Sequence, residues 1–228
     1  QLEGSKAFTK EFLARHAIPT GTYETFTNPD AACAYIQAQG APIVVKADGL
    51  AAGKGVIVAE TLAQAEEAVT DMLSGNAFGE AGCRVVIEEF LAGEQASFIV
   101  IADGDHALPM ARSQDHKRIG EGDTGPNTGG MGAYSPSRLE SKILNKKILE
   151  KIIEPSLKAL KDMNTEFKGF LYAGLMIYNN EPFLIEYNVR MGDPECQTIL
   201  PRLKNDFFEI VDAVISQKLD KINIEWKK

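Results

Sequence analysis

The feature that most constrains the fold of this chain is a glycine-rich stretch, residues 48–55, between two short apolar runs. The runs, 43–46 and 56–59, are rich in β-branched residues and have the composition of strands. Glycine lets backbone N–H groups approach a phosphate closely. The stretch differs from a Walker A loop, which needs a longer spacing between its glycines, Ser or Thr after the lysine, and then a helix. A flap over phosphates and a flexible hairpin without a ligand both fit this pattern.

A lysine ends the first of these two runs. Lys46 follows three apolar residues and comes directly before the glycine-rich stretch. Its ammonium group can reach solvent along its own apolar stem, or it can point into a polar cleft. The neighbouring glycines favour the cleft.

A second glycine-rich segment, residues 119–132, holds six of the twenty glycines in the chain. We expect a polar loop there, and loops of this length are usually functional or disordered. The charged and polar residues 114–118 come directly before it. Composition slightly favours a solvated turn, and the alternative is a cover over the substrate with a basic anion site at its base. His116 in this segment is either a proton carrier or a structural histidine.

Residues 19–91 show the alternation of a compact unit with one sheet and two helices. Strands are expected over 23–27, 43–46, 56–59 and 84–89. Asn28 and Pro29 have the pattern of a helix start, and Gly40 that of a helix end. Thr61 and Gln64 form a capping box for the second helix. Before this unit, Ser5 can cap a helix over 6–16.

A second α+β unit follows. We expect strands over 96–102 and 107–110, a helix over 140–163 that Pro155 kinks or splits, and a final helix from Asp206 to about residue 217. Residues 172–178 and 182–189 predict two strands joined by a turn at Asn179 and Asn180. The whole pattern predicts two α+β lobes with a cleft between them.

One predicted strand carries a row of polar side chains. The two-residue period of a strand places Glu186, Asn188 and Arg190 on one face, with Ile185, Tyr187 and Val189 on the other. Carboxylate and amide oxygens suit Mg²⁺, and arginine suits phosphate. A solvated polar face is the commoner explanation of such alternation. It fits poorly here because residues 192–195 add two more carboxylates at a tight turn.

A third candidate region is the apolar strand 85–91, which we expect to form a hinge between the lobes. Apolar groups around such a backbone stretch can sandwich a flat base. The carboxylate of Glu94 can accept hydrogen bonds from ribose hydroxyls.

Charge and cysteine content exclude several classes of protein. The net charge of -8 argues against a protein that coats nucleic acid, because such a protein needs a basic face. Cys33, Cys83 and Cys196 are too few and too widely spaced for a disulfide framework or a zinc site. We find no apolar run long enough to span a bilayer and no signal peptide. We therefore expect a cytoplasmic protein without nucleic-acid or membrane partners.

Four segments together carry a resemblance to a known family: GLAAGKG at 49–55, QDHKR at 114–118, GPNTGGMG at 125–132 and RMGDPECQ at 190–197. They resemble the motifs of the phosphoribosylamine–glycine ligases, the glycinamide ribonucleotide synthetases of purine biosynthesis. The resemblance runs from residue 2 to about residue 219. Val189 and Met191 depart from the usual residues, and both are exchanges between side chains of the buried type.

The resemblance implies an α+β ATP-grasp fold, in which two α+β lobes hold ATP in the cleft between them. We assign residues 1–18 to a lead-in helix of the larger lobe, 19–91 to the small lobe, and 92–228 to the large lobe with the metal site. Family members also have N- and C-terminal domains that are missing here. We therefore expect the ATP-grasp core of a longer, monomeric enzyme.

The resemblance also implies the site residues. The implied ATP phosphate contacts are Lys6, Lys46, Gly53 and Lys54. The implied adenosine pocket is Glu88, Phe90, Leu91 and Glu94. The implied ligands of Mg²⁺, or of Mn²⁺ in its place, are Glu186 and Asn188. The residues expected to face glycine and the acyl phosphate, and to act in catalysis, are Asp115, Lys117, Arg190 and Asp193.

The implied reaction joins glycine to 5-phosphoribosylamine. The glycine carboxylate attacks the γ-phosphorus of ATP to give glycyl phosphate and ADP. The amine of 5-phosphoribosylamine then attacks the acyl carbon and releases phosphate, which leaves glycinamide ribonucleotide. The alternative is an isolated ATP-binding fragment with no turnover of its own, because the flanking domains are missing.

Overall fold

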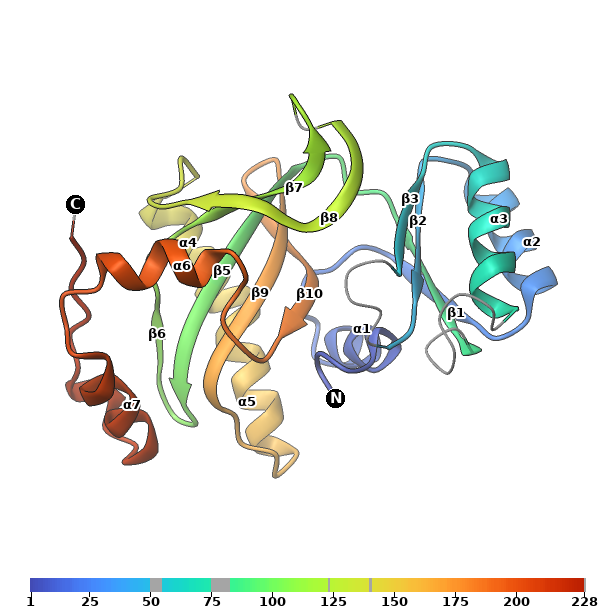
Figure 1. The fold of residues 1–228 in the computed structure, drawn as a ribbon. Coiled ribbons are helices and arrows are strands. Elements are labelled where there is room, and N and C mark those ends of the chain that lie inside the picture. Colours follow the sequence, from blue (N-terminus) through green and yellow to red (C-terminus); the bar gives the residue numbers. More distant parts are fainter. Residues whose placement is uncertain (50–54, 75–82, 123, 140, 228) are drawn as a thin grey trace.

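The computed structural model describes residues 1–49, 55–74, 83–122, 124–139 and 141–227, and these fold around separate sheets (Figure 1). The smaller four-stranded sheet has the order β1-β4-β2-β3, and its neighbouring strands are antiparallel. Its strands are β1 (Tyr23–Phe26), β2 (Ile43–Ala47), β3 (Val56–Ala59) and β4 (Val85–Glu89). The four strands expected in this part of the chain are confirmed.

Two helices, α2 (Pro29–Gln39) and α3 (Leu62–Leu73), pack against this sheet (Figure 1). Both begin at the predicted caps. The Asn28 side chain accepts the N–H of Ala31 at 3.0 Å, and the Thr61 hydroxyl accepts the N–H of Gln64 at 3.3 Å. These caps satisfy N–H groups that have no partner inside the helix. The apolar core between the helices and the sheet contains Ile36, Val45, Val69, Met72 and Ile87.

The larger four-stranded sheet has the order β10-β9-β5-β6 and is also antiparallel. Its strands are β5 (Glu94–Asp103), β6 (Ala107–Pro109), β9 (Lys168–Tyr178) and β10 (Glu181–Asn188). Asn179 and Asn180 turn β9 into β10 with φ angles of 51° and 59°. Asparagine tolerates this left-handed backbone better than most residues, and the predicted hairpin is confirmed.

Helical segments cover one face of the larger sheet. They are α1 (Lys6–Arg15), α4 (Lys142–Ile148), a π-helical turn (Leu149–Ile153) and α5 (Glu154–Asp162). Ser5 caps α1 as predicted, because its hydroxyl accepts the N–H of Phe8. Phe12 and Leu13 of α1 join the core of this larger sheet. The helix expected over 140–163 changes at the π-helical turn directly before Glu154 and Pro155, where the wider turn accommodates the missing N–H of proline.

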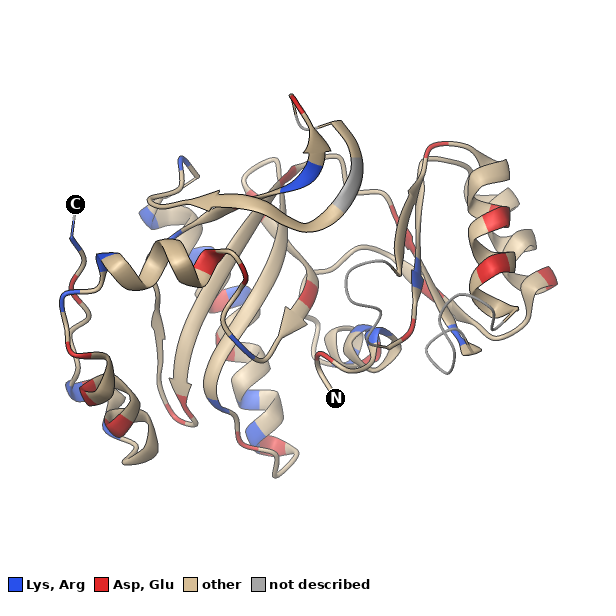
Figure 2. Cartoon of the chain, in the orientation of Figure 1, with Lys and Arg blue, Asp and Glu red and all other residues tan. Residues whose placement is uncertain are grey.

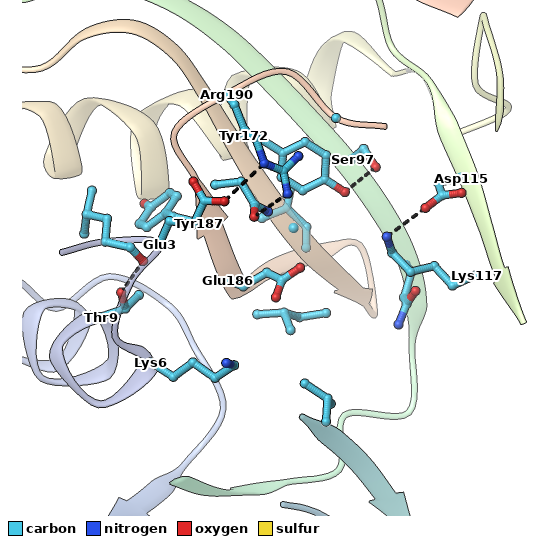
Figure 3. Close-up of a pocket in the computed structure, with 18 of the residues that line it drawn as sticks. Glu3, Lys6, Thr9, Ser97, Asp115, Lys117, Tyr172, Glu186, Tyr187 and Arg190 are labelled. Carbon is cyan, nitrogen blue, oxygen red and sulfur yellow. Dashed lines mark hydrogen bonds and ion pairs between the residues drawn. The ribbon is translucent and has the colours of Figure 1, made fainter. Parts of the chain in front are cut away.

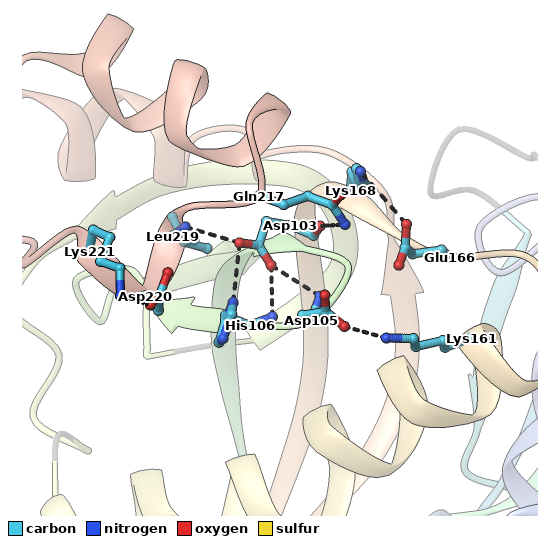
Figure 4. Close-up of polar contacts among 10 residues, drawn as sticks. All are labelled: Asp103, Asp105, His106, Lys161, Glu166, Lys168, Gln217, Leu219, Asp220 and Lys221. Atoms are coloured by element: carbon cyan, nitrogen blue, oxygen red, sulfur yellow. Dashed lines mark hydrogen bonds and ion pairs between the residues drawn. The ribbon is translucent and has the colours of Figure 1, made fainter.

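The C-terminal part of the chain covers the opposite face of the larger sheet. It contains α6 (Glu195–Ile199) and α7 (Phe207–Ile215), and its apolar residues pack with Ile99, Ile101 and Tyr172. Asp103, at the end of β5, fastens this segment to the sheet. Its carboxylate accepts the backbone N–H groups of Asp105, His106 and Leu219 (Figure 4).

The loop expected over 119–132 is wrong. Two strands, β7 (Gln114–Gly120) and β8 (Thr124–Tyr134), form an antiparallel hairpin that arches over the larger sheet (Figure 1). Glycine disfavours strands, which is why the composition predicts a loop. The pairing register shifts twice, at residues 116–118 and 118–120. Such bulges let a glycine-rich strand pair in a bent ribbon.

Charged residues are mixed along the surface. Figure 2 shows acidic and basic positions close together along α5, and there Lys158 pairs with Asp162 at 2.5 Å. None of the helices in the described part of the chain is long and apolar enough to cross a membrane.

Candidate active site

A cavity of about 620 Å³ lies between the two four-stranded sheets, and Figure 3 shows side chains that point into it. This volume is in the range of small-molecule sites. Nine predicted site residues line the cavity: Lys6, Lys46, Glu88, Asp115, Lys117, Glu186, Asn188, Arg190 and Asp193. Three other predicted residues, Phe90, Leu91 and Glu94, are not among the described residues that line the cavity. The predicted Gly53 and Lys54 lie outside the described residues.

The start of α1 brings Lys6 to the glycine-rich stretch. Its ammonium group donates to the carbonyl of Gly49 at 2.8 Å. Burial lowers the pKa of Lys6, and the nearby carboxylate of Glu186 opposes this effect. Lys6 therefore lies between the glycine-rich stretch and the predicted metal strand, and both line the cavity with it.

Asp48 locks the first turn of α1 in place. Its carboxylate accepts the Ser5 hydroxyl and the Ala7 N–H at 3.0 Å, and it forms an ion pair with Arg84. Burial acts to raise the pKa of Asp48, but the Ala7 N–H and the Arg84 guanidinium outweigh it and hold the pKa below its usual value. These contacts connect the two lobes beside Lys6.

Lys46, at the end of β2, lies in the cleft as its position suggested. It is 4% exposed, and its ammonium group lies 2.7 Å from the Glu88 carboxylate. The second oxygen of Glu88 lies 2.7 Å from the ammonium group of Lys10 on α1. Two lysines thus share one buried carboxylate, and their charges keep the pKa of Glu88 low although burial acts to raise it.

Strand β10 carries the predicted metal ligands, and a bulge changes which residues face the cavity. The pairing with β9 shifts between Leu184 and Glu186. Leu184 and Tyr187 belong to the buried core, and Ile185, Glu186 and Tyr187 all line the cavity. Strict alternation placed Ile185 on the face opposite Glu186, and this expectation is wrong because the bulge inserts one extra residue.

Glu186 and Asn188 provide one carboxylate and one amide to the cavity. No group of three or more His, Cys, Asp or Glu suited to a metal occurs among the residues that the structure describes. This donor set fits Mg²⁺, which keeps several waters and binds through a few protein oxygens together with nucleotide phosphates. It does not fit a closed site made of protein ligands alone.

Arg190 follows β10 and is held by neighbours in this structure. Its guanidinium donates to the carboxylate of Glu3 at 3.1 Å and to the side-chain oxygen of Asn188 at 3.2 Å. The Glu3 carboxylate also accepts the N–H of Val189 at 3.0 Å. An anionic ligand can compete with Glu3 for the exposed guanidinium.

A buried hydrogen-bonded network lies in the cavity wall next to Arg190 (Figure 3). The Ser97 hydroxyl donates to Glu195 at 2.8 Å and lies 2.8 Å from the Tyr172 hydroxyl. Glu195 is only 1% exposed. Burial and the Glu195 charge raise the pKa of Tyr172 well above its ordinary value, so it remains a neutral hydroxyl.

Asp115 and Lys117 extend from β7 toward the same space and form an ion pair at 2.7 Å. Burial raises the pKa of Asp115. Burial also acts against the charged form of Lys117, but the hydrogen bond and charge of Asp115 outweigh it and raise the pKa of Lys117. The neighbouring His116 ring stacks on Tyr134 with a centroid distance of 5.7 Å.

Glycines allow the β7–β8 hairpin to approach the turn at 192–195. Gly130 has a φ of +137°, and a Cβ atom there would lie 2.6 Å from Pro194 Cδ and 3.1 Å from Asp115 Oδ1. Any side chain would therefore push the hairpin away from the cavity wall. Gly130 is therefore the glycine of β8 that this close approach requires.

Lys10, Ser97, Tyr172 and Glu195 are among the cavity-lining residues that sequence reasoning missed. Lys10 had a usable signal, because it lies one helical turn after Lys6 on the same face of α1. Glu195 lay in the 192–195 turn that drew attention for its carboxylates. Ser97 and Tyr172 had no signal, because they lie in otherwise apolar strands.

A sequence profile of one protein family matches most of this chain. The family is described as phosphoribosylglycinamide synthetase, ATP-grasp (A) domain, and the match covers residues 4–196. The chain belongs to this family. The matched range includes the cavity-lining parts of β2, β4, β5, β9 and β10, so the phosphoribosylglycinamide synthetase family shares the elements that form the site.

Individual relatives agree with the family. Phosphoribosylamine–glycine ligases from Vibrio parahaemolyticus and Escherichia coli are each 60% identical over 99% of this chain, and the match takes in 53% of their length. The chain thus spans about half the length of the curated relatives it matches. A crystal structure of phosphoribosylamine–glycine ligase from Thermotoga maritima is 35% identical, with a TM-score of 0.88 over 95% of this chain and 55% of that one.

More distant structures show the fold alone. An N5-carboxyaminoimidazole ribonucleotide synthetase, solved as an ADP complex, is 17% identical. It superimposes with a TM-score of 0.73 over 99% of this chain and 54% of that one. The expected α+β ATP-grasp fold of this phosphoribosylglycinamide synthetase family member is confirmed.

Proposed function

We propose that this chain is the ATP-binding part of an enzyme that joins glycine to 5-phosphoribosylamine at the expense of ATP. The products are glycinamide ribonucleotide, ADP and phosphate. The observation that carries the proposal is the cavity, where lysines from α1 and β2 face the Glu186–Asn188 pair of β10. Relatives that are 60% identical and are named phosphoribosylamine–glycine ligase support the choice of reaction.

We assign the phosphates of ATP to the space between the lysines and β10. Lys6 and Lys46 neutralise phosphate oxygens, and the family resemblance assigns Gly53 and Lys54, which lie outside the described residues, to the same phosphates. Glu186 and Asn188 would hold Mg²⁺, or Mn²⁺ in its place. A bound Mg²⁺ supplies charge neutralisation at the phosphates. The adenosine lies toward Glu88, Phe90, Leu91 and Glu94, at the junction of β4 and β5.

We assign the glycine substrate to the part of the cavity near β7 and the turn after β10. Asp115 and Lys117 lie there with Glu195, and Arg190 and Asp193 lie at the turn after β10. A carboxylate such as Asp115 can hold the amine of glycine, and Lys117 and Arg190 can hold its carboxylate and the transferred phosphoryl group. The chain needs no nucleophilic side chain, because glycine itself provides the attacking oxygen.

The main barrier of the first step is the approach of two anions. The glycine carboxylate attacks the γ-phosphorus, and glycyl phosphate and ADP form. In the second step the amine of 5-phosphoribosylamine attacks the acyl carbon, and phosphate leaves. Preorganised cations that offset the developing negative charge, and the positioning of both reactants, account for catalysis in such a site.

The first experiment measures nucleotide binding to this chain by calorimetry, with and without Mg²⁺. We expect ATP to bind and Mg²⁺ to strengthen its binding. Absence of binding at millimolar MgATP contradicts the proposal for this chain.

A second candidate function is a nucleotide-binding module that needs the rest of the enzyme for turnover. The coverage of about half of each relative favours it. ADP formation with glycine and 5-phosphoribosylamine separates the two candidates. Turnover that depends on both substrates excludes the second candidate, and nucleotide binding without turnover supports it.

A further inference from the structure

Lys10 on α1 is a charged residue in an unusual place. It is 2% exposed and is among the largest fully buried side chains of the described residues. Lysine is almost never fully buried unless it is paired. The sequence motifs that led to the site do not include it.

The contacts of Lys10 connect the two lobes. Its ammonium group lies 2.7 Å from one oxygen of Glu88 and donates to the Thr20 hydroxyl at 2.6 Å. The Thr20 hydroxyl in turn donates to the carbonyl of Leu184 on β10 at 2.6 Å. Lys10 therefore links Glu88 of the small lobe to the strand that carries Glu186.

The other oxygen of Glu88 holds Lys46. The Lys46 ammonium group lies 2.7 Å from Glu88 and 3.5 Å from the carbonyl of Ile185. One carboxylate thus serves two lysines, and the group of three residues carries one net positive charge. If Lys10 were neutral, Glu88 would cancel the charge of Lys46 alone.

Stability gives no sufficient reason for such an arrangement. Removing charges from water is costly, and a well-packed apolar group of similar size is often as stable as a buried ion pair. Methionine is close to lysine in length and would fill the same space. The buried charge of Lys10 therefore points to a role in the site.

We propose that Lys10 is a positioning residue for the nucleotide phosphates. It satisfies one oxygen of Glu88, so that Lys46, held at the other oxygen, keeps net positive charge at the cavity. This inference rests on the proposed binding of ATP in the cavity. It adds a residue that does not itself need to touch the ligand.

The test compares Lys10→Met with the unchanged chain. Calorimetry measures MgATP binding, and NMR titration measures binding of adenosine, which has no phosphate. We expect MgATP binding to weaken roughly tenfold, as for loss of one charge-assisted contact, and adenosine binding to stay the same. The matched control is Lys158→Met on the exposed face of α5, where we expect no change in either affinity.

A double variant tests the route through Glu88. In Lys10→Met/Glu88→Gln the carboxylate no longer cancels the charge of Lys46. Because Glu88 is also assigned to the adenosine pocket, the readout is the ratio of MgATP affinity to adenosine affinity in the same variant, and we expect this ratio to return to within about threefold of its value in the unchanged chain. A purely structural role predicts equal losses for ATP and adenosine, and no recovery in the double variant. Either result overturns the inference.

Two further outcomes are distinguishable. If the unchanged chain does not bind MgATP, the proposed function fails. If it binds and Lys10→Met binds equally well, only the role of Lys10 fails. Should Lys10→Met not fold, Thr20→Val replaces it, because it removes the hydroxyl that Lys10 contacts and keeps the side-chain shape. We then expect a smaller loss for MgATP and none for adenosine, and equal losses for both refute the role.

Discussion

Replacing Gly192 by alanine tests whether the turn after β10 needs a glycine. A Cβ atom at this position would lie 2.5 Å from Cδ and 3.0 Å from Oε1 of Glu195. Glu195 cannot simply turn away, because it is 1% exposed and accepts a hydrogen bond from Ser97 at 2.8 Å. The added methyl group must therefore displace a buried carboxylate.

The expected cost combines three effects. Overpacking of a buried site costs about 1–3 kcal/mol. Loss of the hydrogen bond from Ser97 to the charged Glu195 costs about 1.5–3 kcal/mol. Alanine also restricts the unfolded chain, which offsets about 0.4–1 kcal/mol. We expect Gly192→Ala to lower the free energy of unfolding by about 3 kcal/mol.

Thermal and urea unfolding followed by circular dichroism measure this effect. A loss of about 3 kcal/mol corresponds to a fall in Tm of about 6–12 °C for a chain of this size. The matched control is Gly4→Ala, because no atom lies within 4 Å of a Cβ atom built there. We expect the control to unfold within about 0.5 kcal/mol of the unchanged chain.

A double-mutant cycle identifies the contact responsible. In a Glu195→Ala background the methyl group at position 192 contacts no carboxylate. We therefore expect Gly192→Ala to lower the free energy of unfolding by less than about 1 kcal/mol in that background. If Gly192→Ala costs as much in that background, the contact with Glu195 is not the cause. A cost no larger than that of Gly4→Ala would refute the reasoning entirely.

Two further predictions concern Asp103 at the end of β5 and Glu186 on β10. Asp103→Asn places an amide NH₂ opposite backbone N–H groups (Figure 4), and we expect it to cost about 1.5–3 kcal/mol near neutral pH in urea unfolding. Burial opposes ionisation of Asp103, but the N–H groups of His106 and Leu219 hold its pKa below the ordinary value of 3.8. The stabilisation by Asp103 is therefore fully present at pH values above 3.8, and it is lost as the pH falls through the lower pKa of the folded chain. A difference from the unchanged chain that stays constant through this acidic range contradicts the assignment. Glu186→Gln should weaken MgATP binding roughly tenfold in calorimetry and leave adenosine binding unchanged, and an unaltered Mg²⁺ dependence argues against a ligand role for Glu186.

Local signals in the sequence predicted local structure well. Ser5, Asn28 and Thr61 each accept an N–H group three residues further on. Such a bond needs only the first turn of a helix, so nearby residues are sufficient to specify it. The turn at Asn179 and Asn180 was predictable for the same reason.

Signals that depend on distant partners failed. The composition of residues 119–132 predicts a loop, but Gly130 lies in a strand because the turn at Asp193 and Pro194 packs directly against it. The two-residue period of β10 misplaced Ile185, because the bulge depends on how β10 pairs with β9. Neither contact is visible from neighbouring residues.

The sequence by itself determined the helix starts, most strands, and the motif residues Lys6, Lys46, Glu186 and Asn188, which the cavity brings together. Only the tertiary structure decided which charges are paired. Lys10 is a charged residue of a kind that is usually exposed on a helix, yet it is buried because Glu88 and Thr20 satisfy its charge. Burial of a charge is favourable only where partners from several elements meet, and the folded chain alone defines that meeting point.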